Sequence, residues 1–110
     1  MRNKNTQGQD FDKSTEQRVW EKGQIIPGED ANTWRKDVCG AKMKRTDYGN
    51  VNSIYGWEID HIKPKSKGGT DHMDNLQPLQ WENNRDKADN YPTWYCKNGT
   101  TGKQITQTGK

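Results

Sequence analysis

Four polar residues are of types that could together hold a metal ion and move a proton. They are Asp60 and His61 at the end of a predicted strand, Asn75 at the close of the following loop, and Asn84 on a predicted helix. Carboxylate and amide oxygens are hard ligands that suit Mg²⁺ or Mn²⁺. Two such ligands, Asp60 and Asn84, suit an ion that keeps several waters and receives further oxygens from a substrate phosphate. A neutral imidazole at His61 can take a proton from water beside that ion.

The chain around Asp60 and His61 has the pattern of a β-strand. Residues 56–62, GWEIDHI, alternate in the period of two that a half-buried strand shows, and Pro64 ends the strand. Adjacent residues of a regular strand point to opposite faces. Asp60 and His61 can therefore reach one site only if the strand twists or ends there.

A second strand and a helix complete the unit that positions these residues. Residues 63–75 form a polar loop with Gly68-Gly69 at its turn, and residues 76–79 form a short strand. Pro78 confines that strand to a sheet edge or a strand end. The segment WENNRDKAD, which follows Gln80, has helical spacing.

Several of these segments carry a family resemblance: Asp60-His61-Ile62, Gly68-Gly69, Asn75-Leu76-Gln77-Pro78-Leu79 and Asn84-Arg85-Asp86-Lys87. Together they resemble the HNH endonuclease motif of the ββα-metal fold, over residues 55–90. Upstream, the segments CGAKM and DYGN look like the lead-in of compact bacterial members. The resemblance implies a small α+β domain in which a short two-stranded hairpin is followed by a helix. A helix start at Ser14-Thr15-Glu16-Gln17 and a loop-rich segment precede this finger.

Carried over residue by residue, the resemblance implies one role for each member of the set. His61 would be the general base that activates water, and Asn75 would hold the loop and orient His61 through a hydrogen bond to nearby backbone. Asp60 and Asn84 would bind one divalent ion, Mg²⁺ ahead of Mn²⁺. The implied activity is endonucleolytic hydrolysis of phosphodiester bonds in DNA, duplex rather than single-stranded, with no small-molecule cofactor.

The sequence also departs from the family pattern. Many relatives hold a structural zinc with two Cys-x-x-Cys pairs, but here Gln80 and Asn83 stand where one pair would be. Lys42 stands where a partner of Cys39 would fall. We therefore expect no structural zinc, and we expect tryptophans to supply the missing cohesion: Trp34, Trp57 and Trp81.

Basic residues near His61 form a candidate surface for nucleic acid. Lys63, Lys65 and Lys67 alternate, so an extended loop would place them on one side, where they could follow a phosphate backbone. The alternative is a loop that is merely solvated. Arg85 and Lys87 are expected to complete the surface, with Lys42, Lys44 and Arg45 as further candidates.

Composition limits the remaining architecture. Only 26% of the 110 residues are hydrophobic, but five Trp and a net charge of only +3 favour a folded middle. Residues 14–96 are the expected domain, and residues 1–13 and 97–110 are expected to be mobile polar arms. No apolar run could span a bilayer and no secretory signal is present, so a cytoplasmic protein is expected, with Cys39 and Cys96 as free thiols.

Two other function classes remain open. One is a nucleic-acid-binding module that keeps the finger without turnover, and the other is a structural protein whose motif is coincidental. Asp60, His61 and Asn84 together favour the enzyme, because binding alone needs neither a base nor a metal ion.

Overall fold

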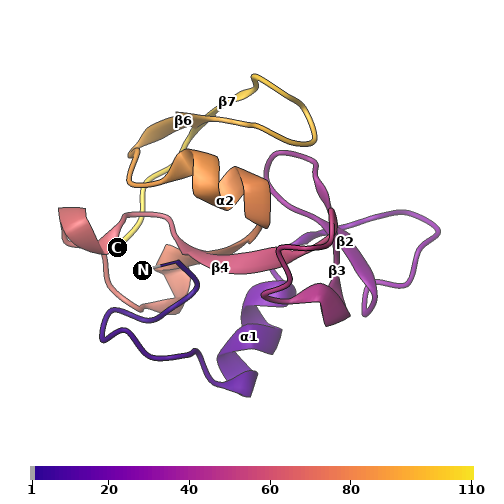
Figure 1. Cartoon of the computed structure of the whole chain (residues 1–110), viewed down its shortest axis with the longest axis horizontal. Helices are drawn as coiled ribbons and strands as arrows, with labels where there is room; N and C mark the ends of the chain where they lie inside the picture. Colours follow the sequence, from indigo (N-terminus) through magenta and orange to yellow (C-terminus); the bar gives the residue numbers. More distant parts are fainter. Residues whose placement is uncertain (1) are drawn as a thin grey trace.

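The computed structural model describes residues 2–110 as a small α+β domain with two helices and small antiparallel sheets (Figure 1). The helices are α1 (Lys13–Trp20) and α2 (Trp81–Lys87). The strands are β1 (Gln24–Ile25), β2 (Trp34–Lys36), β3 (Lys42–Lys44), β4 (Trp57–His61), β5 (Leu76–Gln80), β6 (Thr93–Tyr95) and β7 (Gln104–Thr106). They pair as β1-β2-β3, β4-β5 and β6-β7. Within residues 2–110, no helix has the length and apolar character needed to cross a membrane.

Helix α1 begins one residue before the expected start at Ser14. Asp12 is its N-cap, because the Asp12 carboxylate accepts a hydrogen bond from the backbone N–H of Thr15 at 2.8 Å. The last two residues of the helix, Val19 and Trp20, are fully buried against the β4-β5 hairpin. The helix thus covers the hairpin that carries the candidate site.

The β4-β5 hairpin is the centre of the fold, and both predicted strands are present. Its register runs from the pair Trp57–Gln80 to the pair His61–Leu76. Pro78 lies opposite Ile59, whose backbone N–H points away from β5 and donates to Asn3. The two residues are therefore a non-hydrogen-bonded pair, and the missing N–H of Pro78 faces away from β4. A two-stranded sheet has only edges, which is why it tolerates this proline.

The loop between β4 and β5 needs both of its glycines. A Cβ on Gly69 would lie 1.7 Å from the Lys63 carbonyl oxygen, and Gly68 has a φ of +91°. Within this loop, Lys65–Lys67 is a 3-10 helix and not the extended segment expected from the alternation of lysines. A 3-10 helix turns about 120° per residue, so Lys65 and Lys67 do not share one side.

The described parts of both predicted arms lie in contact with the domain. In the C-terminal segment, β7 pairs with β6, and Ile105 is buried beside Trp94 and Leu79. Ile105 is the single large aliphatic residue of that segment. The otherwise polar composition predicts a mobile arm, but this one buried side chain packs the segment against the domain. In the N-terminal segment, Asn3 and Thr6 hydrogen-bond to the domain.

The prediction of two free thiols is wrong in this structure, because Cys39 and Cys96 form a disulfide bond. The bond joins the turn before β3 to the residue after β6, and both cysteines are buried in a small cluster with Trp94. A separation of 57 residues in the sequence gave no local sign that the two would meet.

The expectation about tryptophans is only partly right. Trp57 is fully buried, whereas Trp34 and Trp81 are half-buried at the surface. Trp20 and Trp94 fill the interior instead, one in each of two apolar clusters. The core is therefore split between the α1 side and the disulfide side of the hairpin.

Candidate active site

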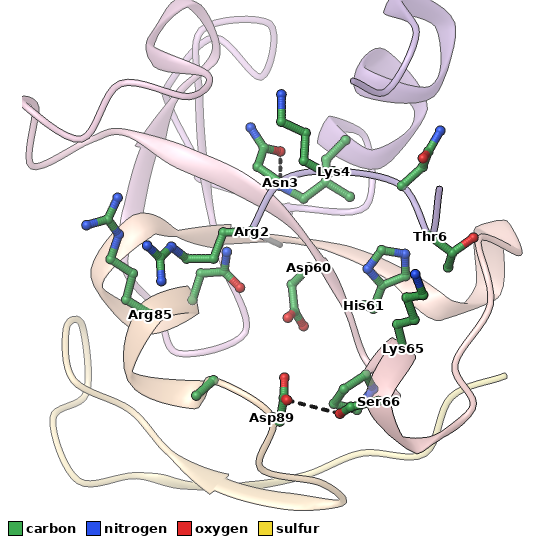
Figure 2. A pocket seen from close by; sticks show the side chains of 15 residues that line it. Arg2, Asn3, Lys4, Thr6, Asp60, His61, Lys65, Ser66, Arg85 and Asp89 are labelled. Carbon is green, nitrogen blue, oxygen red and sulfur yellow. Dashed lines mark hydrogen bonds between the residues drawn. The ribbon is translucent and has the colours of Figure 1, made fainter. Parts of the chain in front are cut away.

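Asp60, His61 and Asn84 line one cavity of about 560 Å³ (Figure 2). Asp60 and His61 come from β4, and Asn84 comes from α2. His61 is the last residue of β4, so the strand ends where the two neighbours must turn toward the same space. The residues that the sequence singled out from separate elements thus share one cavity.

The Asp60 carboxylate is almost fully buried and has two side-chain partners. Its Oδ2 accepts a hydrogen bond from Gln77 Nε2 at 3.0 Å, and its Oδ1 lies 3.3 Å from the Lys87 ammonium. Burial raises the pKa of Asp60 above its ordinary value, against the opposing effects of Lys87 and Gln77. Asp60 is therefore a buried acid whose charge depends on its neighbours.

Asn84 offers an amide oxygen to the same cavity. Its Nδ2 donates to Glu58 Oε1 at 3.0 Å, which fixes the orientation of the amide. Among the described residues, Asn84 Oδ1 has no hydrogen-bond partner. No cluster of three or more His, Cys, Asp or Glu side chains that could hold a metal ion occurs in residues 2–110. The donor set is thus one carboxylate and one amide oxygen, which fits a hard divalent ion that keeps most of its waters.

The His61 ring is held by a carboxylate that sequence reasoning missed. Its Nε2 lies 2.8 Å from Asp71 Oδ1, and the Phe11 ring lies 5.9 Å from the imidazole, centroid to centroid. The backbone N–H and the hydroxyl of Thr6 both donate to Asp71. Burial alone would raise the pKa of Asp71, but the hydrogen bonds from His61 and Thr6 together outweigh it and lower that pKa. Asp71 lies in the polar loop without a distinguishing pattern, so only the folded chain identifies it.

Asn75 does not line the cavity, but its hydrogen bonds hold the two ends of the β4-β5 loop together. Its side chain accepts from the Lys63 backbone N–H at 2.9 Å and donates to the carbonyl oxygens of Lys63 and Thr70. Its own carbonyl accepts from the backbone N–H of Ile62 at 2.8 Å. Asn75 is fully buried, and its bonds fix the two residues that directly follow His61.

The predicted cationic residues divide into those at the cavity and those away from it. Lys65 and Arg85 line the cavity, whereas Lys63 and Lys67 do not. Lys87 requires a correction: it is only 1% exposed, because it lies on the inner side of α2 and its ammonium bonds to Asp60 and the His61 carbonyl. It is not part of the outer surface on which phosphate contacts were expected.

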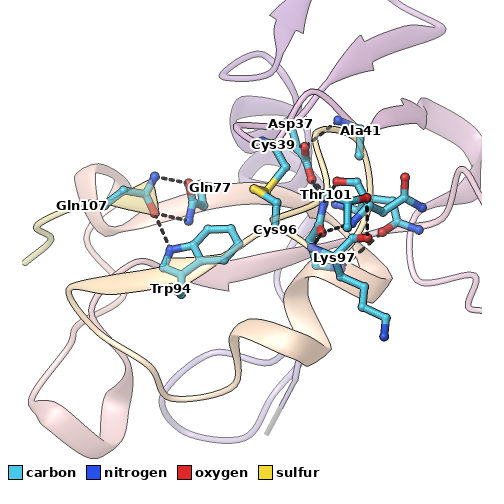
Figure 3. The surroundings of a disulfide bond; sticks show 12 residues. Asp37, Cys39, Ala41, Gln77, Trp94, Cys96, Lys97, Thr101 and Gln107 are labelled. Carbon is cyan, nitrogen blue, oxygen red and sulfur yellow. Dashed lines mark hydrogen bonds between the residues drawn. A yellow bond between two sulfur atoms is a disulfide. The ribbon is translucent and has the colours of Figure 1, made fainter. Parts of the chain in front are cut away.

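Asp37 lies beside the Cys39–Cys96 disulfide and connects the turn before β3 to the start of α2 (Figure 3). Its Oδ1 accepts from the backbone N–H groups of Cys39 and Ala41, both at 2.9 Å. Its Oδ2 accepts from the Gln80 backbone N–H and from Asn83 Nδ2, both at 3.0 Å. Burial raises the pKa of this carboxyl, against the four N–H donors that stabilise its charge. Asp37 is a buried crosslink that sequence reasoning did not find.

Comparison with known proteins identifies the central part of the chain. Residues 37–90 match the family model for the HNH endonuclease. No curated protein and no solved structure matches the chain. The matched residues include β4, β5 and α2, and with them Asp60, His61, Asn75 and Asn84. Residues 37–90 of the chain therefore form an HNH endonuclease domain.

Proposed function

We propose that this protein is a metal-dependent endonuclease that hydrolyses phosphodiester bonds in DNA through a ββα-metal finger made of β4, β5 and α2. The observation that carries the proposal is the meeting of Asp60, His61 and Asn84 at one cavity. An acid, an imidazole and an amide are brought there by two separate elements. Family membership over the same residues supports nuclease chemistry.

His61 is the proposed general base. In the neutral imidazole, an Nε2–H that donates to Asp71 leaves Nδ1 without a proton, and Nδ1 can then accept a proton from an attacking water. Asn75 keeps the backbone after His61 in place through its bonds to Lys63. The imidazole that takes the proton from water is thus held by Asp71 at its ring and by Asn75 through the backbone that follows it.

Asp60 and Asn84 are the proposed ligands of a divalent ion, Mg²⁺ or Mn²⁺. Such an ion supplies electrostatic stabilisation of charge on the phosphate and on the leaving oxygen. Lys65 and Arg85 lie at the same cavity and would bind neighbouring phosphates of the DNA.

One observation favours the non-catalytic binding module. Lys87 already neutralises Asp60, so the carboxylate has a charge partner without any metal ion. In that alternative the finger binds DNA and does not turn over. Dependence of cleavage on a divalent ion separates the two functions.

The test is conversion of supercoiled plasmid DNA to nicked and linear forms with Mg²⁺, Mn²⁺ or EDTA. We expect cleavage with either ion and none with EDTA. His61→Ala should lower the rate by roughly 10² to 10⁴ while DNA binding persists, because a positioned base contributes about that factor. Arg18→Gln is the control, since Arg18 is exposed on α1 and does not line the cavity.

Cleavage by His61→Ala at the parent rate, or cleavage unaffected by EDTA, would contradict the proposal. DNA binding without cleavage, whichever metal ion is added, would support the binding module instead.

The redox state of the cysteines is a second variable of the assay. Disulfides persist mainly in oxidising compartments, so the Cys39–Cys96 bond is not what the expected cytoplasmic setting would favour. The assay is therefore run with and without dithiothreitol.

A further inference from the structure

The segment Arg2–Thr6 forms one side of the cavity that holds Asp60, His61 and Asn84. All five of its residues line that cavity. Figure 2 shows the segment passing across the site, with Arg2 on the side of Arg85 and Thr6 on the side of His61. The family match begins only at residue 37, so this wall lies outside the matched region.

Asn3 fastens the segment to the outer edge of β4. Its side-chain oxygen accepts from the Ile59 backbone N–H at 2.9 Å and from the Tyr48 hydroxyl at 2.8 Å. Asn3 has a φ of +56°, in the left-handed region that asparagine tolerates better than most residues. The contact also satisfies an N–H on a strand edge that would otherwise be open.

Thr6 fastens the other end of the segment to the partner of His61. Its hydroxyl donates to Asp71 Oδ2 at 2.7 Å and its backbone N–H donates to Asp71 Oδ1 at 3.0 Å. Asp71 Oδ1 in turn lies 2.8 Å from His61 Nε2. The segment therefore lies one side chain away from the proposed base.

The charges of the segment suit a polyanion. Lys4 is paired with Asp10, whereas Arg2 is exposed and forms no ion pair among the described residues. Of the two acidic groups at the cavity, Asp60 is paired with Lys87, whereas Asp89 accepts a hydrogen bond from the Ser66 hydroxyl and forms no ion pair among the described residues. Arg2 is thus a cation whose charge is available to a ligand.

We propose that Arg2–Thr6 is a working wall of the nucleic-acid site, in which Arg2 binds a DNA phosphate beside the one that is attacked. Asn3 is the positioning residue that holds Arg2 at this place. The inference rests on the proposed endonuclease function and extends it to residues outside the family match. Guanidinium groups bind phosphate through paired N–H donors, and Arg2 and Arg85 lie on the same side of the cavity (Figure 2).

The first experiment measures binding of a labelled DNA duplex across a salt series, with Ca²⁺ in place of Mg²⁺. Arg2→Gln should weaken binding and reduce the slope of log K against log salt by roughly 0.9, the value of one phosphate contact on duplex DNA. Arg18→Gln removes the same charge from an exposed site on α1 and should leave the slope unchanged. If Arg2→Gln has the same slope of log K against log salt as the parent protein, the inference is overturned.

The second experiment releases the segment. Asn3→Ala removes both acceptor contacts and should reproduce the slope of Arg2→Gln, and it should also raise KM more than it lowers kcat. Tyr48→Phe removes only one of the two contacts and should give a smaller effect. Faster cleavage by Asn3→Ala would overturn the inference, because the segment would then be blocking the site. If the parent protein binds no DNA, the proposed function is overturned as well. If the parent cuts DNA and the Arg2 and Asn3 variants bind and cut it equally well, this inference alone is overturned.

Discussion

Asp60 and Lys87 form a buried ion pair between β4 and α2, with 3.3 Å between Oδ1 and Nζ. The two side chains are 7% and 1% exposed. Lys87 also donates to the carbonyl oxygen of His61, so one ammonium contacts both of the adjacent residues to which we assign chemistry. The proposed metal ligand therefore already has a positive charge at its side.

Replacing Lys87 by methionine should make the fold depend on metal. The change leaves Asp60 buried without its partner, which should lower the free energy of unfolding by about 3 to 5 kcal/mol. Added Mn²⁺ should then raise the Tm of Lys87→Met more than it raises the Tm of the parent. Thermal unfolding with and without Mn²⁺ measures this, with Lys67→Met at an exposed position as control. Equal Mn²⁺-induced Tm shifts would contradict the prediction that the ion takes the place of Lys87 as the charge partner of Asp60.

Asn75→Ala should loosen the loop after His61 without removing a metal ligand. The truncation leaves the Lys63 N–H and the carbonyls of Lys63 and Thr70 without their partner, at a cost of roughly 1 to 3 kcal/mol for each group that stays unsatisfied. We expect lower stability and slower cleavage with nearly unchanged Mn²⁺ affinity. Urea unfolding, plasmid cleavage and titration calorimetry give the three readouts. A large loss of Mn²⁺ affinity would argue against the purely orienting role.

Sequence periodicity was sufficient for the elements that carry the site. The alternation over 56–62, the position of Pro78 and the helical spacing after Gln80 predicted β4, β5 and α2 with boundaries close to those observed. These signals are local, because each depends on residues within one strand or one helical turn. The same signals placed Asp60, His61 and Asn84 on elements that the fold brings together.

The rest of the site depends on contacts between distant residues. Thr6 meets Asp71, and Asn3 meets Ile59, across more than fifty positions of the sequence. The residue pattern of a polar segment does not predict hydrogen bonds between residues so far apart in the sequence. Burial of Lys87 was missed for a related reason: a lysine on a short helix reads as exposed unless its buried partner is known.

Asp37→Asn should destabilise the domain more than its small change in shape suggests. Asparagine has one acceptor oxygen, and its NH₂ would face two N–H donors that the Asp37 carboxylate now satisfies. We expect a loss of roughly 2 to 4 kcal/mol in the free energy of unfolding. Chemical denaturation measures it, and Asp86→Asn on the exposed face of α2 is the matched control. Equal stability of the two variants would contradict the crosslinking role.

Tyr48 should lose its proton at a higher pH than an ordinary tyrosine. Burial, together with the negative charge of Glu16, raises the pKa of Tyr48 to about 12. The unfolded chain loses this proton first, so the free energy of unfolding should fall as the pH rises from about 10 to about 12. Phenolate absorbance should show a late titration that Tyr48→Phe removes. Titration of every tyrosine near the ordinary value would refute the burial of this hydroxyl beside Asn3.

The bond between Cys39 and Cys96 makes the central part of the chain a covalent ring. β4, β5 and α2 all lie inside that ring, and so does the exposed 3-10 turn Lys65–Lys67. A protease that cuts a single peptide bond in this turn would open the backbone but could not separate the two pieces. The nicked molecule would keep both halves of the site in register until a reductant opened the ring at its sulfur atoms.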